Sequence, residues 1–453
     1  MVVGAGLAGL TAARELHRAG RSVIVLEARR RVGGRTLTKR VRGGGHVDRG
    51  ATFVGPTQNH ILELARQMGV GTFPTYDQGQ NVYVVGDSRL TYSDTGITGT
   101  APPDPAILPD LARVVTRLDE MSTRVPVDAP WRAAEAPDWD SQTLESWIGQ
   151  NGVTPRFRSF VPVATRPIFG AEPRDLSLLF VLFFIAASGD GRHVGTFERN
   201  FNTRGGAQMS RIEGGAQLIA QRVARRLGRH RVLLGAPVRR IEQGRRGARV
   251  FAPRFSVRAR RVIVAVPPAL AGRIEYHPAM PVPRDQLTQR LAQGSLIKAT
   301  AVYDQAFWRD RGLTGMALSP AGPVNATFDD SPPSGRPGVV FGFIGGDEAR
   351  LHRRRSPAGR RAAVLRSLSR FFGTEATRPR EYFETDWAAS EWSRGCPVGI
   401  AGPGTLLAYG PALRRPVGPI HWAGTESSTY WNGYMDGAVR SGQRAAREVL
   451  AEL

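Results

Sequence analysis

The chain has 453 residues, of which 41% are hydrophobic and 22% charged, values typical of a globular protein with room for two domains. The longest apolar run, Leu176–Ala187, is too short to span a bilayer, and no cleavable signal pattern precedes the first predicted strand. We therefore expect a cytoplasmic protein with no membrane partner. Because Met1 already belongs to a predicted strand, it stays open whether the natural start lies upstream.

The formal net charge of +23 raises the alternative of nucleic-acid binding. However, 60 of the 62 basic residues are arginine and they are spread along the chain, which is more typical of coding bias than of a phosphate-binding face. The single cysteine, Cys396, excludes an intrachain disulfide and a cysteine-cluster metal site. We predict neither a nucleic-acid partner nor a metal.

The first elements predict a dinucleotide-binding unit. A short apolar run leads into a glycine turn, then a helical pattern, then a second apolar run that ends in Glu27. Gly4 allows the tight turn, Gly6 lets the backbone approach a pyrophosphate, and Gly9 lets helix and strand pack closely. Glu27 follows Gly9 at close to the spacing of about 20 residues expected for the carboxylate that holds a ribose hydroxyl.

The continuation narrows the cofactor. A second glycine pair ends at Gly34 and is followed by Arg35, which predicts another backbone N–H cradle and a cation for the same pyrophosphate. The string EAxxRVGGRT resembles the FAD-binding signature of the flavin-containing amine oxidase family. The resemblance implies FAD as the cofactor, with Ala28 and Arg29 among the residues that bind it.

The family resemblance covers essentially the whole chain and implies its fold. We expect an α/β protein in which an FAD-binding Rossmann-like domain with the GxGxxG motif is interleaved with an α+β substrate-binding domain. The FAD domain would be discontinuous, comprising residues 1–71, 213–283 and 390–453. The substrate domain would comprise residues 72–212 and 284–389.

Four further residues in the first 240 positions are assigned by the resemblance. The loop Asp48–Asn59 is similar to a family stretch that lines both flavin and substrate space, which places Thr52 at the cofactor and Phe53 at the substrate. Gln208 matches a glutamine that faces substrate. Val238 lies where the chain returns to the FAD domain and would meet the adenine through its backbone.

Lys298 is one of only two lysines, and it lies in the apolar strand pattern Leu296–Tyr303. A buried lysine is costly unless it is paired or hydrated. The alternative is an edge lysine whose ammonium reaches solvent. The string GSLIKATAVYDQAFWR resembles the family segment whose lysine holds a water against the flavin N5, so we predict a catalytic role.

Cys396 has two interpretations. A lone cysteine is usually a small buried hydrophobe. Its place also matches the cysteine that is thioether-linked to the flavin in mitochondrial monoamine oxidases, which many bacterial relatives lack, so covalent attachment of FAD stays an alternative. Trp387 matches a family tryptophan near the flavin.

The C-terminal block, HWAGTE followed by YWNGYMDGAV, is the most specific match to the family. It implies cofactor contacts from Gly424, Thr425, Gly433 and Met435, and it makes Tyr434 one wall of an aromatic cage on the flavin face. The family's second cage tyrosine follows the cysteine. Here that position is Pro397, so we expect a pocket that is wider and less polar on that side.

Together these residues imply an FAD-dependent amine oxidase that moves a hydride from the amine α-carbon to the flavin. Oxygen would be the acceptor, and the products would be an imine or aldehyde, ammonia and hydrogen peroxide. One alternative keeps the fold but oxidises a polyamine, an amino acid or a cyclic or tertiary amine. The other is a flavin-fold protein that binds nucleic acid or chromatin. Homodimer formation stays open.

Overall fold

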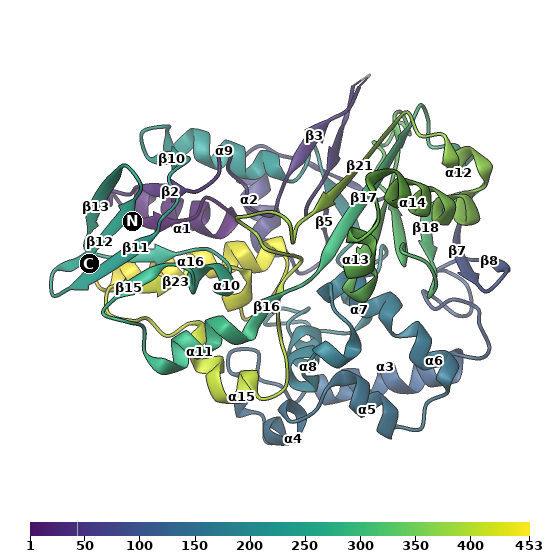
Figure 1. Ribbon diagram of the computed structural model, residues 1–453, viewed down its shortest axis with the longest axis horizontal. Coiled ribbons are helices and arrows are strands. Elements are labelled where there is room, and N and C mark those ends of the chain that lie inside the picture. The colour runs from purple at the N-terminus through teal and green to yellow at the C-terminus, as the bar shows by residue number, and fades with distance from the viewer. Residues whose placement is uncertain (43) are drawn as a thin grey trace.

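The computed structural model describes residues 1–42 and 44–453. A five-stranded parallel sheet lies on the left of Figure 1, in the order β10-β2-β1-β14-β23. Every neighbouring pair in it is parallel, and most of its residues are buried Val, Leu and Ile, as expected for a sheet covered on both faces. Its strands are β10 (Val232–Leu234), β2 (Val25–Glu27), β1 (Val2–Val3), β14 (Val262–Val264) and β23 (Ile420–Trp422).

Helices from both ends of the chain cover this sheet. Helix α1 (Leu7–Arg18) follows the glycine turn, and α16 (Met435–Ala451) packs directly against it (Figure 1). The approach is close because small residues meet there: a Cβ on Gly442 would lie 2.3 Å from the carbonyl oxygen of Ala8. Helices α9 (Gln217–Leu227) and α2 (Asn59–Gln67) complete the layer.

A second, seven-stranded sheet forms the upper right of Figure 1, in the order β21-β17-β20-β19-β18-β7-β8. Its central strands are antiparallel, and β17 (Leu296–Tyr303) is buried along its whole length. Lys298 lies in that strand, opposite Phe343 on one neighbour and Thr385 on the other. The remaining strands are β21 (Glu381–Asp386), β20 (Gly338–Gly345), β19 (Ala326–Asp329), β18 (Leu313–Leu318), β7 (Gln80–Val85) and β8 (Ser88–Tyr92). Helices α13 (Gly346–Arg353) and α14 (Pro357–Phe372) follow β20 along the chain.

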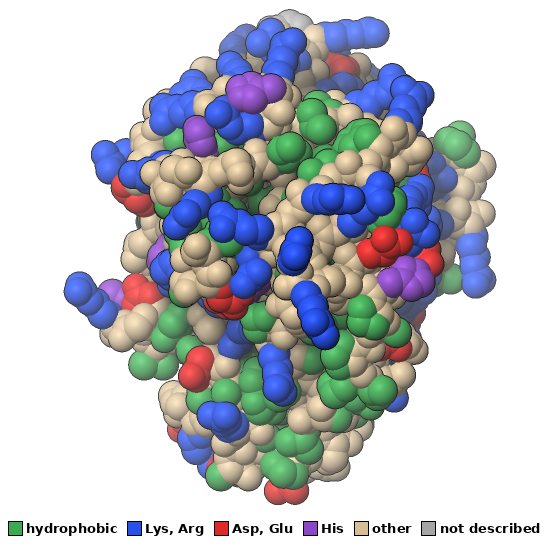
Figure 2. Space-filling model, turned by 90° about the vertical axis from the view of Figure 1, so that its left-hand side faces the viewer, with side chains coloured by type: hydrophobic (Ala, Val, Ile, Leu, Met, Phe, Trp, Pro, Cys, Tyr) green, Lys and Arg blue, Asp and Glu red, His purple; other side chains and the backbone are tan. Residues whose placement is uncertain are grey.

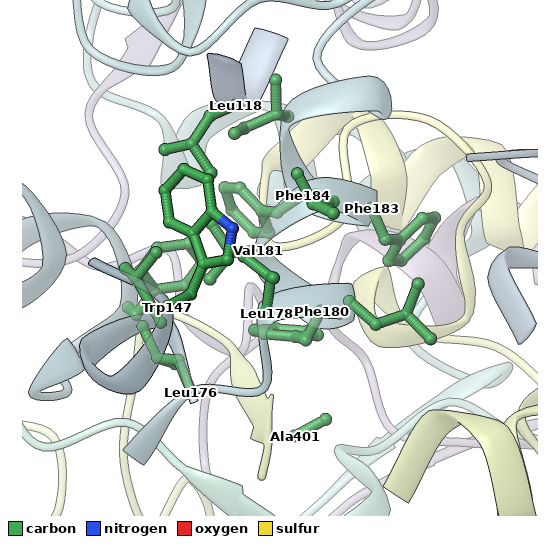
Figure 3. Close-up of a cluster of buried hydrophobic side chains, with 14 of the residues drawn as sticks. Leu118, Trp147, Leu176, Leu178, Phe180, Val181, Phe183, Phe184 and Ala401 are labelled. Atoms are coloured by element: carbon green, nitrogen blue, oxygen red, sulfur yellow. The ribbon is translucent and has the colours of Figure 1, made fainter. Parts of the chain in front are cut away.

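A block of helices lies below the seven-stranded sheet in Figure 1. Its centre is α8 (Leu178–Ala186), all of whose residues are buried, so the longest apolar run of the sequence forms a buried helix. Figure 3 shows Trp147 and Leu118, from two other helices of the block, packed around it. The block also contains α3 (Leu108–Ser122), α4 (Ala136–Asp140), α5 (Leu144–Gln150), α6 (Pro155–Phe160) and α7 (Pro162–Phe169).

Two parts of the fold differ from what the apolar pattern of the sequence suggests. Residues 157–187, which suggest two helices, contribute to three, because Pro162 starts a new helix and Gly170, at a φ of 65°, ends it. The stretch 255–266 is not one buried strand. Its first part is β13 (Phe255–Ala259), which lies at the edge of a separate four-stranded sheet with Phe255 exposed, and only β14 joins the parallel sheet.

The four-stranded sheet has the order β13-β12-β11-β15, and its other strands are β12 (Gly247–Ala252), β11 (Arg240–Gly244) and β15 (Glu275–His277). A small three-stranded sheet joins β5 (Phe53–Val54), β9 (Ser210–Ile212) and β6 (Thr72–Pro74). Two-stranded pairs join β3 (Thr38–Arg40) with β4 (His46–Asp48), and β16 (Leu291–Gln293) with β22 (Gly399–Ala401). Across the described ranges, no helix combines the length and apolar character that a bilayer span needs.

Candidate active site

One large cavity, of about 840 Å³, connects the glycine turn after β1 with the seven-stranded sheet and the helical block. It brings together every site residue that the sequence predicts, except Gly9. Its wall includes Gly4, Gly6, Glu27, Ala28, Arg29, Gly34, Arg35, Thr52, Phe53, Gln208, Val238, Lys298, Trp387, Cys396, Pro397, Gly424, Thr425, Gly433, Tyr434 and Met435. Residues more than 400 positions apart therefore share one space.

The glycine turn fits a dinucleotide. Gly4 has a φ of 101°, and a Cβ there would lie 2.9 Å from the carbonyl oxygen of Ala265 on the neighbouring strand loop. Gly9 is absent from the cavity wall because its function is packing: a Cβ there would lie 2.0 Å from the carbonyl oxygen of Gly4. The turn leaves the N-terminus of α1 open toward the cavity, where free N–H groups favour a phosphate.

The carboxylate of Glu27 lies at the end of β2 and is almost fully buried. One of its oxygens accepts a hydrogen bond of 2.7 Å from the backbone N–H of Ala5, and the other accepts one of 2.9 Å from that of Arg29. These bonds fix the carboxylate at the cavity wall, where the free lone pairs of its oxygens suit a ribose hydroxyl.

Arg35 makes an ion pair that sequence reasoning missed. Its guanidinium donates to both oxygens of Glu426, at 2.7 and 3.0 Å, and to the backbone carbonyl of Pro397 at 2.8 Å. Burial acts to raise the pKa of Glu426, but the Arg35 guanidinium outweighs this effect and holds the pKa below its ordinary value. The pair joins the second glycine motif to the C-terminal block, and Arg35 still lines the cavity.

Lys298 points from β17 toward the loop that contains Thr52. Its ammonium donates to the Thr52 hydroxyl at 2.5 Å and to the Gly50 carbonyl at 3.3 Å, and it lies 3.6 Å from the centre of the Phe341 ring. The side chain is 2% exposed, so it does not reach solvent as an edge lysine would. Burial lowers the pKa of Lys298 to about 8, against the opposing effect of the Asp330 and Asp48 carboxylates.

Cys396 and Trp387 belong to one small buried cluster with Leu296, the first residue of β17. The indole N–H of Trp387 donates to the backbone carbonyl of Arg49 at 3.0 Å, which fixes the ring at the cavity wall. Burial raises the pKa of the Cys396 thiol to about 12, so the free thiol is neutral at physiological pH.

Tyr434 forms an aromatic wall of the cavity. Its ring lies 4.9 Å from that of Trp431 and 5.8 Å from that of Phe184, measured between centroids. Its hydroxyl donates to the backbone carbonyl of Asn200 at 2.8 Å, and burial raises the pKa of Tyr434 above its usual range. Gln208 donates to the same carbonyl at 3.4 Å. Asn200 is thus a further cavity residue, and nothing in its sequence neighbourhood indicates it.

Beyond Tyr434 the cavity continues into the helical block as an apolar arm. Two of its residues, Phe160 and Leu118, belong to the same buried cluster as α8, whose packing is shown in Figure 3. Side chains of this arm are carbon-rich, and they include Leu108, Leu111, Val115, Leu144, Ile148 and Phe157. The arm can therefore accommodate a hydrocarbon group at one end of a ligand whose other end lies near Lys298 and Tyr434.

The parallel sheet has a glycine turn after β1, a buried carboxylate at the end of β2 and a cavity that both of them line. These features define an FAD- or NAD-binding protein of the Rossmann type. Comparison with known proteins decides between these cofactors. Residues 7–450 match the family model described as flavin containing amine oxidoreductase. The chain belongs to this family, and FAD is its cofactor.

The similarity to relatives is full-length. A Mycobacterium tuberculosis protein named as flavin-containing monoamine oxidase AofH is 42% identical over 460 residues, which is 100% of this chain and 96% of that protein. The flavin-containing amine oxidase of Oncorhynchus mykiss is 36% identical over 100% of this chain and 86% of its own.

Solved structures agree. Cyclohexylamine oxidase from Brevibacterium oxydans IH-35A superposes with a TM-score of 0.94 at 35% identity, covering 100% of this chain and 98% of the other. Putrescine oxidase bound to putrescine superposes with a TM-score of 0.93 at 32% identity, covering 99% and 98%. The protein is therefore an FAD-dependent oxidoreductase that acts on amines, with the two-part α/β fold that its sequence predicts.

Proposed function

We propose that this enzyme oxidises a primary monoamine that carries an apolar aryl or alkyl group, with oxygen as the electron acceptor. The observation that carries the proposal is the apolar arm of the cavity, which begins beside Tyr434 and extends among the helices α3, α5 and α6. The amine, oxygen and water would give an aldehyde, ammonia and hydrogen peroxide.

The cavity favours the reactive form of the substrate. An alkylamine is cationic at neutral pH, and only the neutral amine, with its nitrogen lone pair free, supports the loss of a hydride from the α-carbon. Phe53 and Tyr434 present carbon surfaces to the amine, and burial in such surroundings disfavours the cation. FAD, when bound, supplies the two-electron acceptor for that hydride. The residues of the chain then have to bind and orient the substrate and to exclude water. None of them is needed as a dedicated base.

In this proposal Lys298 acts in the oxidative half-reaction, in which oxygen reoxidises the reduced cofactor. Its ammonium is fixed by Thr52 and lies in the cavity wall, where it can hold a water molecule or stabilise negative charge that develops on oxygen. The residues around the glycine turn and the C-terminal block bind the cofactor. Cys396 lines the cavity and shares a buried cluster with Trp387 and Leu296, which supports our proposal of a thioether link to the flavin.

The similarity to putrescine oxidase makes a diamine the main alternative to a monoamine substrate. A second ammonium would need a carboxylate at the far end of the cavity, and Glu198 is an acidic residue of the cavity wall. Glu198 is exposed, and its one side-chain hydrogen bond, from Thr100, is long at 3.4 Å. An exposed carboxylate gains little from pairing, so the apolar arm favours the monoamine.

An amino acid would need a free arginine for its carboxylate. Five arginines line the cavity: Arg29, Arg35, Arg239, Arg273 and Arg394. Arg35 is engaged by Glu426 and Arg29 donates to Ser393 at 2.6 Å, and all five belong to the segments proposed as the FAD domain. The proposal therefore prefers a substrate without a carboxylate.

The proposal also covers nucleic acid as a partner, the location of the enzyme and its division into domains. The basic side chains on the face shown in Figure 2 are scattered among uncharged and apolar ones, which supports a solvated surface and not a nucleic-acid-binding face. We further propose a cytoplasmic enzyme, with FAD and substrate domains divided near residues 72, 213, 284 and 390, and with the state of oligomerisation open.

A panel of amines with peroxide detection tests the substrate class. The expected order of kcat/KM places aryl-alkylamines and cyclohexylamine above putrescine, and putrescine above amino acids. Activity highest on putrescine would overturn the monoamine assignment and leave amine oxidation itself intact.

A further inference from the structure

A second, smaller pocket lies at the end of β23, where Trp422 forms part of its wall. The rest of the wall comes from α10 (Pro268–Ala271), from the segment 272–280 and from α11 (Val282–Arg290). Its volume is about 150 Å³, the share of about five water molecules in the liquid, which suits a ligand of a few heavy atoms. None of the glycines that line the large cavity lines this pocket, so it is separate from the pyrophosphate site.

Arg284, on α11, is the buried charged residue of this pocket. In the described part of the chain, two arginines are buried, Arg211 at 2% and Arg284 at 4% exposed. Arg211 has a counter-ion, since its Nη2 lies 2.7 Å from Oδ1 of Asp330. Among the described residues no carboxylate supports the cation of Arg284: burial lowers its pKa to about 10, and only the Tyr276 phenol acts in the opposite direction. A buried cation without a counter-ion is costly, and a bound anion would supply one.

The hydrogen bonds of Arg284 leave one edge of its guanidinium unpaired. Nη1 donates to the backbone carbonyls of Ala412 at 2.9 Å and Leu413 at 3.5 Å. The central carbon of the guanidinium lies 3.5 Å from the centre of the Trp422 ring, which fixes its plane. Neither Nε nor Nη2 donates a hydrogen bond to a described residue. These two nitrogens form the fork that binds both oxygens of a carboxylate or phosphate.

The remaining polar side chains of the pocket do not neutralise Arg284. The Tyr276 hydroxyl donates to the carbonyl of Ala271 at 3.1 Å, and burial raises its pKa above the usual range, so it stays neutral. Asp285 is the acidic residue of the wall, but it is exposed and accepts a bond of 2.7 Å from Gln289. Because the Asp285 carboxylate is solvated, its charge is screened and leaves the buried part of the pocket positive.

We propose that this pocket binds a small oxyanion, a carboxylate or a phosphate, whose oxygens accept hydrogen bonds from Nε and Nη2 of Arg284. Trp422 holds the guanidinium from its face and the carbonyls of residues 412 and 413 hold it from the opposite edge, so the fork is preorganised. The bound anion would be the counter-ion that the chain itself does not provide. This site is independent of the amine that the enzyme oxidises.

Isothermal titration calorimetry of the FAD-loaded protein tests the site, because bound cofactor keeps added anions out of the pyrophosphate site. Acetate and inorganic phosphate are the probes for the two kinds of oxyanion. Chloride is the probe for an anion that cannot accept from both nitrogens of the fork. Each is titrated into protein in a buffer that contains none of the three, at constant ionic strength.

We expect one saturable site per chain for acetate, for phosphate or for both, and binding of chloride that is at least tenfold weaker. Saturation by only one of the oxyanions would support the site and identify the ligand as a carboxylate or as a phosphate. If neither oxyanion binds to saturation, Arg284 serves only to join α11 to the carbonyls of residues 412 and 413, and the proposal is wrong. Chloride binding as tight as that of the oxyanions would also contradict it.

Arg284→Met removes the fork and keeps an apolar side chain against Trp422. This variant should weaken oxyanion binding at least tenfold. The matched control is Arg290→Gln, which removes one positive charge from an exposed position of the same helix, outside the pocket. It should bind as the parent does. An equal loss in both variants would show that the anions respond only to the general positive charge of the protein, and parental affinity in Arg284→Met would exclude the fork.

Ala279→Phe provides a second test if Arg284→Met fails to fold. Ala279 is an exposed residue of the pocket wall, so a larger side chain there fills the pocket and leaves Arg284 in place. The variant should lose saturable binding while its flavin is still reduced by amine at the parental rate. A folded Ala279→Phe protein with parental affinity for acetate and phosphate would overturn the proposal, and amine oxidation would be unaffected by that result.

Discussion

The hydroxyl of Tyr434, in the C-terminal block, donates a 2.8 Å hydrogen bond to the backbone carbonyl of Asn200, in the short 3-10 helix Glu198–Asn200. This bond holds the one tyrosine wall of the cavity in place while its ring packs on Trp431 and Phe184. The wall is therefore positioned by backbone from a different part of the chain.

Tyr434→Phe tests that positioning. The ring remains, but the buried Asn200 carbonyl loses the shorter of its two hydrogen bonds and keeps the 3.4 Å bond from Gln208, so we expect a loss of about 0.5–1.5 kcal/mol in the free energy of unfolding. Tyr434→Ala should additionally reduce kcat/KM for every amine. Urea unfolding and steady-state kinetics measure the two effects. An alanine variant with parental kcat/KM would show that the ring does not touch substrate.

Pro397→Tyr tests the open side of the cavity. Proline leaves a small apolar wall there, and its carbonyl is held by Arg35, so a tyrosine ring at this position should project into the space beside Tyr434. The ratio of kcat/KM for a slim amine such as phenethylamine to that for a bulky or N-substituted amine should rise. An unchanged ratio would mean that residue 397 does not limit the substrate.

Arg35→Met should be strongly destabilising, because it leaves the carboxylate of Glu426 buried without its cation. Removal of one partner of such a pair costs about 3–5 kcal/mol, and the double variant with Glu426→Gln should recover much of that loss. Unfolding by denaturant compares the single and double variants. Equal stability of the two would show that Glu426 finds another partner.

The ion pair of Arg35 with Glu426 also predicts that the protein loses stability in acid. The pKa of Glu426 is held below its ordinary value of about 4.3, so its stabilisation is complete above that value and is lost as the pH falls through the lower folded-state pKa. Unfolding curves between pH 6 and 3 should lose this part of the stability in the parent. In Glu426→Gln the acid dependence should be shallower.

Lys298→Met keeps the volume of the side chain and removes its charge. We expect the variant to fold and bind FAD, and to be reoxidised by oxygen at least tenfold more slowly, a barrier increase of about 1.4 kcal/mol or more. Anaerobic reduction and aerobic reoxidation are followed separately by stopped flow. Parental rate constants in both half-reactions would remove Lys298 from the mechanism.

Cys396→Ala tests the thioether link. If the link exists, acid-denatured parent protein retains its yellow colour after filtration and the variant releases it. Complete release of flavin from the parent would show that Cys396 is only a small buried hydrophobe, as its apolar neighbours Leu296 and Trp387 also allow.

Local patterns made much of the site predictable. The spacing of Gly4, Gly6, Gly9 and Glu27 encodes a strand, a turn, a helix and a strand, and each constraint acts within 30 residues. Lys298 was recognisable because the chain has almost no other lysine and because its strand is apolar on both faces.

Long-range partners were not predictable. The ion pair of Arg35 with Glu426 spans 391 positions, and the approach of Asp48 to Asp330 spans 282. No local pattern identifies the partner of Glu426 among 60 arginines, and nothing near Asp48 in the sequence indicates Asp330. The apolar arm was hidden for a similar reason, since Leu144 or Phe157 reads as ordinary core and only the packing of several helices leaves space between such residues.

The most direct test of the central claim is anaerobic mixing of the FAD-loaded protein with phenethylamine, cyclohexylamine and putrescine while the flavin absorbance is recorded. An enzyme that oxidises apolar monoamines should be bleached fastest by the first two, and air should restore the colour with one hydrogen peroxide per flavin. A flavin that stays oxidised with both monoamines, at amine concentrations that saturate related amine oxidases, would contradict the account.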